Sequence, residues 1–272
     1  MSPLWIPMFL EAIKHDFETP LPPHKDTSAS TSVEDLQWIN QNAEDDDPFD
    51  TLRLKKQMID AVQTNKAFLQ TRVCALGTIL VLTFEPIEER IWTFWWHCIR
   101  LICPGKHVRV VFYLHPKGRD LPPKGTAIES QHINGGLTMR CDAKTVVVYR
   151  KEEATRVLIH ELFHANCSDP YEKDTQFLEA DTEAWAEIFL CAALAKGNKK
   201  EFEKLLHEQF LYALEQTEYL QKNHNVESPQ QYAWRYTVGR LDVWKRLGFT
   251  MPHGTKRSVP KSLRLTKESL EP

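Results

Sequence analysis

The chain has 272 residues, of which 42% are hydrophobic, 26% charged and 10% aromatic. These proportions are typical of a globular protein with one large domain or two small ones, and ten Gly and 16 Pro exclude a collagen-like chain. Because 34 Lys and Arg stand against 37 Asp and Glu, the chain lacks the basic excess of nucleic-acid-binding domains. We therefore expect no nucleic-acid partner.

The sequence shows no targeting segment and no disulfide framework. The stretch 1–17 lacks a basic region and carries Pro3 and Pro7, unlike a signal peptide. The longest apolar run, 73–84, has 12 residues, whereas a membrane helix needs about 20. The six cysteines include no C-x-x-C pair, so we expect reduced thiols in an intracellular, cytoplasmic protein without a membrane partner. They are Cys74, Cys98, Cys103, Cys141, Cys167 and Cys191.

Charge is distributed unevenly along the chain. Residues 33–50 contain seven acids and no Lys or Arg, and residues 251–272 contain five bases against two acids. We expect a flexible acidic N-terminal arm over 1–51, one domain over 52–250, and a basic C-terminal tail over 251–272. Both ends can be solvated tails; contact between the two tails, or of either with a partner, is the alternative.

The first half of the chain has the pattern of a small mixed sheet with helices. Apolar residues recur at helical spacing in some segments, and other segments are rich in β-branched residues, as buried strands are. The expected elements are helices over 54–69 and 87–102, and strands over 78–84, 108–114, 136–139 and 145–149. The second helix carries Trp92, Trp95 and Trp96 at helical spacing, which indicates an aromatic face packed into the core.

The second half of the chain is helical in pattern. The last helix has the clearest start signal, with Ser228 as N-cap, Pro229 at the first helical position and Gln231 completing a capping box. The expected helices span 152–166, 176–196, 200–222 and 228–248. A small mixed sheet followed by a helical bundle is an α+β architecture.

The first of these helices carries the sequence His-Glu-Leu-Phe-His over 160–164. One helical turn separates His160 from His164, so both imidazoles can bind a single Zn²⁺, and Glu161 lies beside the open position of the metal. A catalytic zinc also needs a third protein ligand and a water. The motif therefore predicts a zinc site with Glu161 as general base.

The third ligand is expected from the acidic stretch that follows. Glu183 comes after a spacer of 18 residues, and a helix running antiparallel to the first would bring its carboxylate to the metal. Glu179 is the competing candidate. Glu187, one turn after Glu183, can orient a ligating histidine. For Glu179 and Glu187, a solvated acidic helix face is the alternative.

The pattern His160-Glu161-x-x-His164-x18-Glu183 resembles the gluzincin zinc metallopeptidases, to which thermolysin and the zinc aminopeptidases belong. The resemblance implies a zincin-like active-site helix with zinc bound by the two histidines and the distal glutamate. Thermolysin has one more intervening residue, so the aminopeptidase spacing is closer, but the aminopeptidase Gly-x-Met-Glu-Asn signature is absent. The wider segment 108–187 also resembles predicted metallopeptidases encoded by large DNA viruses.

The same resemblance implies two further parts of a peptidase site. The first is an oxyanion donor from the helices after the third ligand. Tyr236 is the favoured candidate, followed by Tyr232; His224 and Tyr219 are also candidates. The second is an edge strand that holds the substrate backbone, for which Asn134, Gly135 and Gly136 are the candidates, although a plain turn would also suit these residues.

The sequence thus predicts a zinc-dependent metallopeptidase that hydrolyses peptide bonds in a protein or peptide substrate with one catalytic zinc ion. The main alternative is a catalytically inactive zinc-binding interaction protein with a metallopeptidase-like fold. Glu161 favours the enzyme, because a structural site needs no base and closes its fourth position with a Cys or His. Cys167 is the nearby residue that would close it. A third interpretation is a nucleic-acid module that uses the basic C-terminus.

Overall fold

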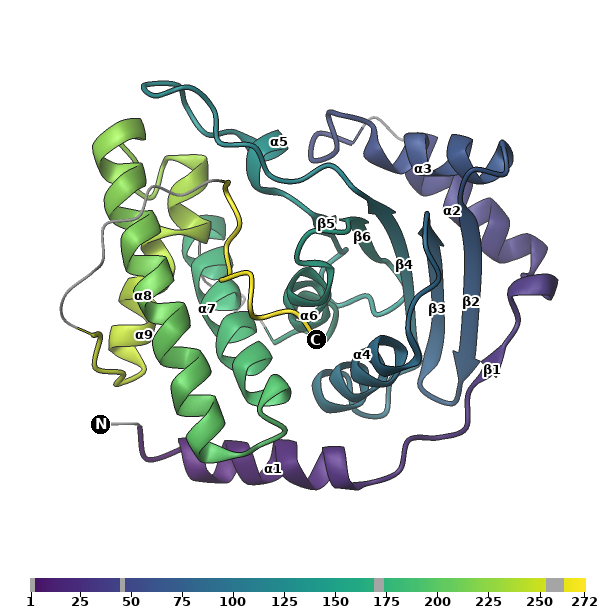
Figure 1. Ribbon diagram of the computed structural model, residues 1–272, viewed down its shortest axis with the longest axis horizontal. Coiled ribbons are helices and arrows are strands. Elements are labelled where there is room, and N and C mark those ends of the chain that lie inside the picture. The colour runs from purple at the N-terminus through teal and green to yellow at the C-terminus, as the bar shows by residue number, and fades with distance from the viewer. Residues whose placement is uncertain (1–2, 45–46, 169–173, 253–261) are drawn as a thin grey trace. The chain divides into compact units, whose positions relative to one another are not determined.

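The computed structural model describes residues 3–44, 47–168, 174–252 and 262–272 (Figure 1). They form two compact units. A sheet unit comprises the described residues of 20–118 and 134–168, and a helical unit comprises those of 1–19, 119–133 and 169–271. Each unit is described by itself.

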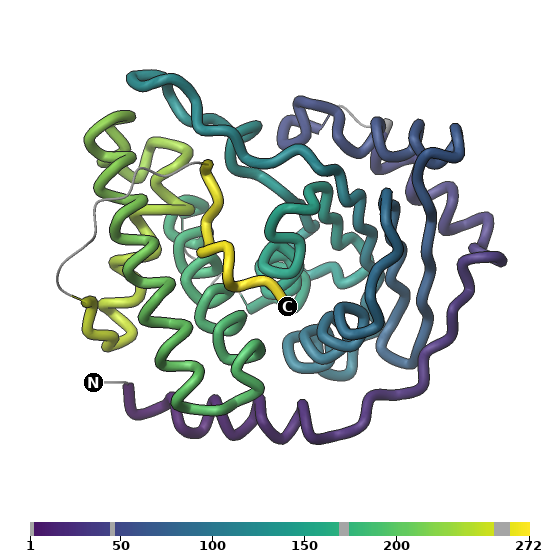
Figure 2. Tube along the Cα trace, in the orientation of Figure 1, coloured from purple at the N-terminus to yellow at the C-terminus, as the bar shows by residue number. Residues whose placement is uncertain are grey.

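The sheet unit is built on a mixed sheet whose strand order is β1-β2-β3-β4-β6-β5 (Figures 1 and 2). A hairpin pairs β2 with β3, β3 and β4 run parallel, as do β4 and β6, and β5 pairs antiparallel to β6 at the edge. The strands are β1 (Lys25–Asp26), β2 (Phe68–Cys74), β3 (Gly77–Thr83), β4 (Val108–His115), β5 (Gly136–Leu137) and β6 (Val146–Arg150). A short 3-10 turn, η1 (Ser28–Ser30), follows β1.

Helices cover both faces of this sheet. Because successive side chains of a strand point to opposite faces, Val111 packs with Met58 on the side of α2 (Val33–Glu44) and α3 (Leu54–Gln63). The next residue, Phe112, stacks on Trp95 at a centroid distance of 4.1 Å, on the side of α4 and α6. These two helices are α4 (Glu89–Ile102) and α6 (Ala154–Ala165). The tryptophan face predicted for α4 is therefore in the core.

The helical unit packs around the long buried helix α7. Its small side chains Ala184, Ala186 and Ala192 are fully buried, which lets neighbouring helices approach closely. Ring contacts such as Phe210 with Trp244, at 4.4 Å between centroids, join α8 to α9. The helices of this unit are α1 (Ile6–Glu18), α5 (Ser130–Ile133), α7 (Thr175–Leu194), α8 (Lys199–His224), the 3-10 helix η2 (Tyr232–Tyr236) and α9 (Val238–Arg246).

The α+β class predicted from the sequence is confirmed by the mixed sheet and the helices around it. The terminal segments differ from the expected flexible arm and tail. The first 51 residues contain α1, β1 and α2, and α1 buries Ile6, Leu10 and Ile13. At the other end, Leu263 and Leu265 are buried. Apolar residues at these positions hold both segments, which charge counts alone do not reveal.

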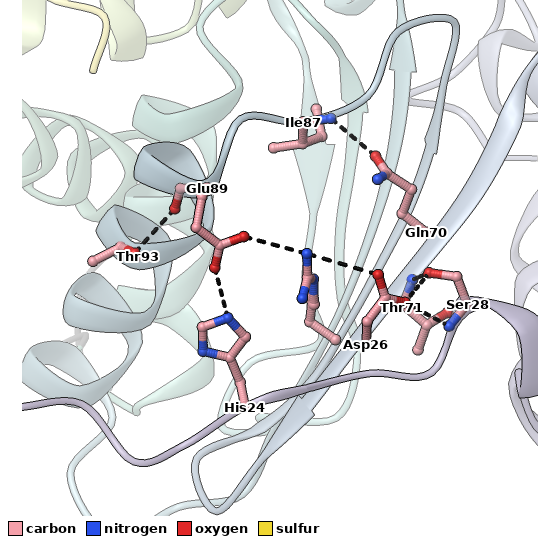
Figure 3. A network of polar contacts seen from close by, with 9 residues as sticks. His24, Asp26, Ser28, Gln70, Thr71, Ile87, Glu89 and Thr93 are labelled. Carbon is pink, nitrogen blue, oxygen red and sulfur yellow. Dashed lines mark hydrogen bonds and ion pairs between the residues drawn. The ribbon is translucent and has the colours of Figure 1, made fainter.

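Polar contacts attach the N-terminal segment to the sheet unit (Figure 3). His24 Nε2 lies 2.7 Å from a carboxylate oxygen of Glu89, and Arg72 on β2 reaches the other oxygen of Glu89 at 3.3 Å. Arg72 also pairs with Asp26 of β1 at 3.7 Å, and the Ser28 hydroxyl accepts a hydrogen bond from the backbone of Thr71. Asp26, an acid of the predicted arm, is therefore paired within the sheet unit.

Three sequence predictions are wrong in detail. The helix expected from residue 54 ends at Gln63, because the chain turns through Asn65 at φ 56° and enters β2, which was not predicted. The helix expected over 228–248 is instead η2 followed by α9. Gln231 does bond the backbone amide of Ser228, but the chain then makes a 3-10 turn, and the buried Thr237 hydroxyl donates to the carbonyl of Ala233.

The third wrong prediction concerns the cysteines. Cys141 and Cys167 form a disulfide across a sequence separation of 26, whereas Cys74, Cys98, Cys103 and Cys191 are free. A loop of that length closed by a disulfide is worth about 3.5 kcal/mol in the chain-entropy treatment. Sparse cysteines without a motif gave no sign of this pair.

None of the helices in the described ranges is long and apolar enough to cross a membrane.

Candidate metal centre

The predicted metal-binding motif lies on α6, which follows β6 directly. Glu153, at φ 60°, makes the sharp turn between the strand and the helix, and its carbonyl accepts the amide of Val157. The indole of Trp95 on α4 donates to the hydroxyl of Thr155 at 2.9 Å. A strand, a helix neighbour and a left-handed turn thus fix where α6 begins.

The two histidines converge as the spacing predicts. His160 and His164 are 6% and 8% exposed, and their Nε2 atoms lie 3.0 Å apart. Two nitrogen ligands of a tetrahedral zinc, each at about 2.0–2.1 Å, lie about 3.3 Å from each other. The observed separation therefore suits chelation of one small cation after a shift of a few tenths of an ångström.

Glu161 lies beside the edge strand β5. A Cβ placed on Gly136 would lie 2.6 Å from Val157 Cγ1, 2.7 Å from Val147 O and 3.0 Å from Glu161 Oε1. Only a residue without a side chain lets β5 and α6 come this close. The predicted general base is therefore next to the backbone of an edge strand, where an added peptide strand can pair.

A buried arginine fixes the segment that leads into β5. Arg150, 1% exposed, donates from Nε to Asn134 O at 2.8 Å and from Nη1 to the carbonyls of Lys117 and Gly118. The backbone amide of Tyr149 donates to Gly135 O at 2.7 Å. The predicted substrate segment 134–136 thus has a fixed backbone, and sequence reasoning missed Arg150, whose only signal was a charge ending an apolar strand.

The C-terminal end of α6 is held by a second set of contacts. His164 O accepts the backbone amides of Cys141 at 2.9 Å and Cys167 at 3.1 Å, and these two residues form the disulfide. Lys106 Nζ lies 3.4 Å from Ala165 O, where a cation complements the negative end of a helix. The carbonyl of His164, a predicted zinc ligand, is therefore hydrogen-bonded to both residues of the disulfide.

The acidic candidates lie on α7 in the helical unit. Glu183 and Glu187 are fully buried, and Glu179 is partly buried. Glu187 forms an ion pair with the buried Arg240, which also donates to Leu265 O at 2.7 Å. A buried carboxylate needs such a partner, so the pair explains Glu187 without a metal. The role predicted for it, orienting a histidine, stays a prediction.

Tyr236 and Tyr232 lie together on η2. Their hydroxyl oxygens are 3.5 Å apart. Burial of the phenol raises the pKa of Tyr236 well above its usual value, and the nearby carboxylate of Glu179 raises that pKa further. Tyr236 therefore keeps its proton at neutral pH and can donate a hydrogen bond.

The other two candidates for the oxyanion donor, His224 and Tyr219, pack against each other. His224 Nδ1 lies 3.0 Å from Thr126 O, and its ring lies 6.0 Å from that of Tyr219.

The predicted residues thus form two groups. The sheet unit brings together His160, Glu161, His164 and the segment 134–136, and the helical unit brings together Glu179, Tyr232 and Tyr236. Comparison with protein families, with curated proteins and with solved structures gives no match.

The close approach at Gly136 predicts a large stability difference between two glycine substitutions. Gly136→Ala should lower the free energy of unfolding by about 2 kcal/mol, because the new methyl group meets Val157 and a backbone carbonyl. Gly118→Ala is the control, since its nearest neighbour is the flexible carboxylate of Glu152 at 3.3 Å. Urea unfolding measures both, and equal losses would contradict the packing described.

The raised pKa of Tyr236 predicts an absent titration step. In native protein, wild type and Tyr236→Phe should show the same rise in tyrosinate absorbance near pH 10, whereas in urea the wild type should show one phenol more. Because the folded pKa exceeds the unfolded one, wild type should also lose more stability than the variant as the pH rises past about 10. A native titration that is one phenol smaller in the variant would contradict this assignment.

Proposed function

We propose that the chain is a gluzincin-like zinc metallopeptidase that hydrolyses peptide bonds in a protein or peptide substrate. The observation that carries the proposal is the distance of 3.0 Å between the buried Nε2 atoms of His160 and His164. Glu161, the residue after His160, lies beside the edge strand β5. Two buried nitrogen donors with a neighbouring carboxylate that can act as a base suit a catalytic zinc site, because a structural site is closed by four Cys or His ligands and needs no base.

In this proposal the residues of the chain divide the work of amide hydrolysis. A bound zinc ion would supply a water with a pKa of about 7 and polarise the scissile carbonyl. Glu161 takes the proton from the attacking water and passes it to the leaving nitrogen. Tyr236, kept protonated by its surroundings, donates a hydrogen bond to the oxyanion that develops on the substrate.

The third zinc ligand in this proposal is a carboxylate of α7. The spacing from His164 favours Glu183. The proximity of Glu179 to the phenol of Tyr236 favours Glu179, because ligand and oxyanion donor then lie together. Both have ligand chemistry suited to zinc, and we give Glu179 the first place, with Glu183 one turn further along the helix.

Substrate binding in this proposal uses β5. An extended peptide pairs with the outer edge of this strand, and the glycines at 135 and 136 let its backbone approach. Strand addition selects for an extended, unfolded stretch of polypeptide rather than for one side chain. An intracellular location is part of the proposal. Four of the six cysteines are free thiols, and the Cys141–Cys167 disulfide would then be one of the exchangeable bonds that cytosolic proteins carry.

Replacing the general base should separate metal binding from turnover. Glu161→Gln should keep stoichiometric zinc and lose at least about 10²-fold in peptide cleavage, because the amide cannot accept the proton. Metal analysis and an unbiased peptide-cleavage profile of wild type and variant measure both. Stoichiometric zinc without cleavage by wild type would leave the interaction protein as the function, and absence of zinc binding would contradict both.

Paired substitutions on α7 identify the third ligand. Glu179→Gln should weaken zinc binding by at least about tenfold, and Glu183→Gln less, if the carboxylate beside Tyr236 is the ligand. The exposed Glu218→Gln on α8 is the control. Competition titration with a zinc chelator measures the affinities. The reverse order would assign Glu183, and two unchanged affinities would contradict a ligand from α7.

A further inference from the structure

The disulfide in the sheet unit closes directly onto the predicted metal-binding helix. Cys141 lies in the turn between β5 and β6, and Cys167 follows the end of α6. Both residues adopt left-handed backbone conformations, at φ 66° and 60°. Their amides both donate to His164 O. The amide of Ser168 also donates to Phe163 O at 3.1 Å, so Cys167 has the place and the conformation of an ordinary helix C-cap. Cys141, in contrast, reaches His164 O from another segment, in a left-handed conformation that a non-glycine residue seldom adopts.

We propose that Cys141–Cys167 is a thiol–disulfide exchange site, and that its reduction frees the turn that carries Cys141 from the end of α6 and weakens metal binding through His164. The exchange and the release of the turn follow from the sheet unit alone. The effect on metal binding rests on the proposed function. Small dithiols, or proteins that carry a reactive dithiol, are the chemical class of reductant that fits the site.

Accessibility favours exchange at this bond. Cys167 is exposed and Cys141 is partly buried, so an incoming thiolate can reach the bond from the side of Cys167. Three of the free cysteines, Cys98, Cys103 and Cys191, are buried. Burial raises the pKa of Cys103 to about 11 and that of Cys191 well above its usual value, which keeps both as weakly reactive thiols. Rearrangement with these internal thiols therefore does not compete.

The exchange balances with a dithiol. A reductant thiolate attacks Cys167 Sγ, the bond between the cysteines breaks, and Cys141 leaves as a thiolate that takes up a proton. The second thiol of the reductant then attacks the mixed disulfide and releases Cys167. The protein gains two thiols, and the reductant is oxidised to a disulfide.

Release of the turn follows from backbone preference. Residues other than glycine seldom adopt left-handed conformations, because the Cβ atom crowds the following carbonyl. Without the bond, Cys141 can return to an ordinary conformation, and its amide then leaves His164 O, whereas Cys167 stays in the C-cap of α6. The backbone that carries the His164 imidazole then loses its contact with the connection between β5 and β6, so the two nitrogen donors are held less tightly.

The test compares oxidised and reduced protein. Thiol titration in denaturant should find four thiols before reduction and six after it. On treatment with dithiothreitol, the peptide covering 138–145, which contains the amide of Cys141, should lose hydrogen-exchange protection while a peptide from α4 keeps it. Zinc affinity, measured in each state after removal of the reductant under anaerobic conditions, should fall by roughly tenfold.

Matched variants complete the test. Cys141→Ser with Cys167→Ser should resemble the reduced wild type and should not respond to dithiothreitol, and Cys74→Ser, at a partly buried free thiol, should behave as wild type. Six thiols before reduction would overturn the proposal, as would unchanged exchange protection on reduction. If neither redox state binds zinc, the proposed function fails, and the exchange measurement still decides whether the turn is released.

Discussion

The candidate site depends on one close approach, between β5 at Gly136 and α6 at Val157 and Glu161. Because position 136 has no side chain, the helix can lie against the edge of the sheet with its carboxylate beside strand backbone. The helical repeat then carries His160 and His164 to the same face, with their nitrogens 3.0 Å apart. Everything proposed for catalysis in the sheet unit follows from that packing.

Buried arginines fix the position of backbone segments in both units. Arg150 binds carbonyls before β5 and after β4, and Arg240 joins Glu187 to Gln216 and to Leu265 O. A guanidinium has five donors in a rigid fork, so one side chain can hold several chain segments at once. Burying such a residue costs free energy unless its donors form hydrogen bonds. Both arginines form hydrogen bonds to segments that are distant in sequence.

Sequence patterns predicted the elements whose structure depends mainly on interactions within the element itself. The β-branched run that became β3 and the tryptophan face of α4 were predictable because period and residue type agree, and the one-turn spacing of the histidines needed only a helix. Tertiary contacts overrode the pattern elsewhere. The capping signal at Ser228 starts a 3-10 turn, β2 exists because β3 pairs with it, and Cys141 meets Cys167 only after α6 packs on the sheet. Arg150 and Arg240 gave no periodic signal at all.

The central claim is that α6 contributes two imidazoles to one zinc ion whose other ligands are oxygen. X-ray absorption at the zinc edge of the metal-loaded protein tests this claim directly. The account predicts two imidazoles with further nitrogen or oxygen ligands at about 2.0–2.2 Å and no sulfur. A zinc–sulfur distance of about 2.3 Å would contradict it. So would spectra of the His160→Ala and His164→Ala variants that do not differ from that of the wild type.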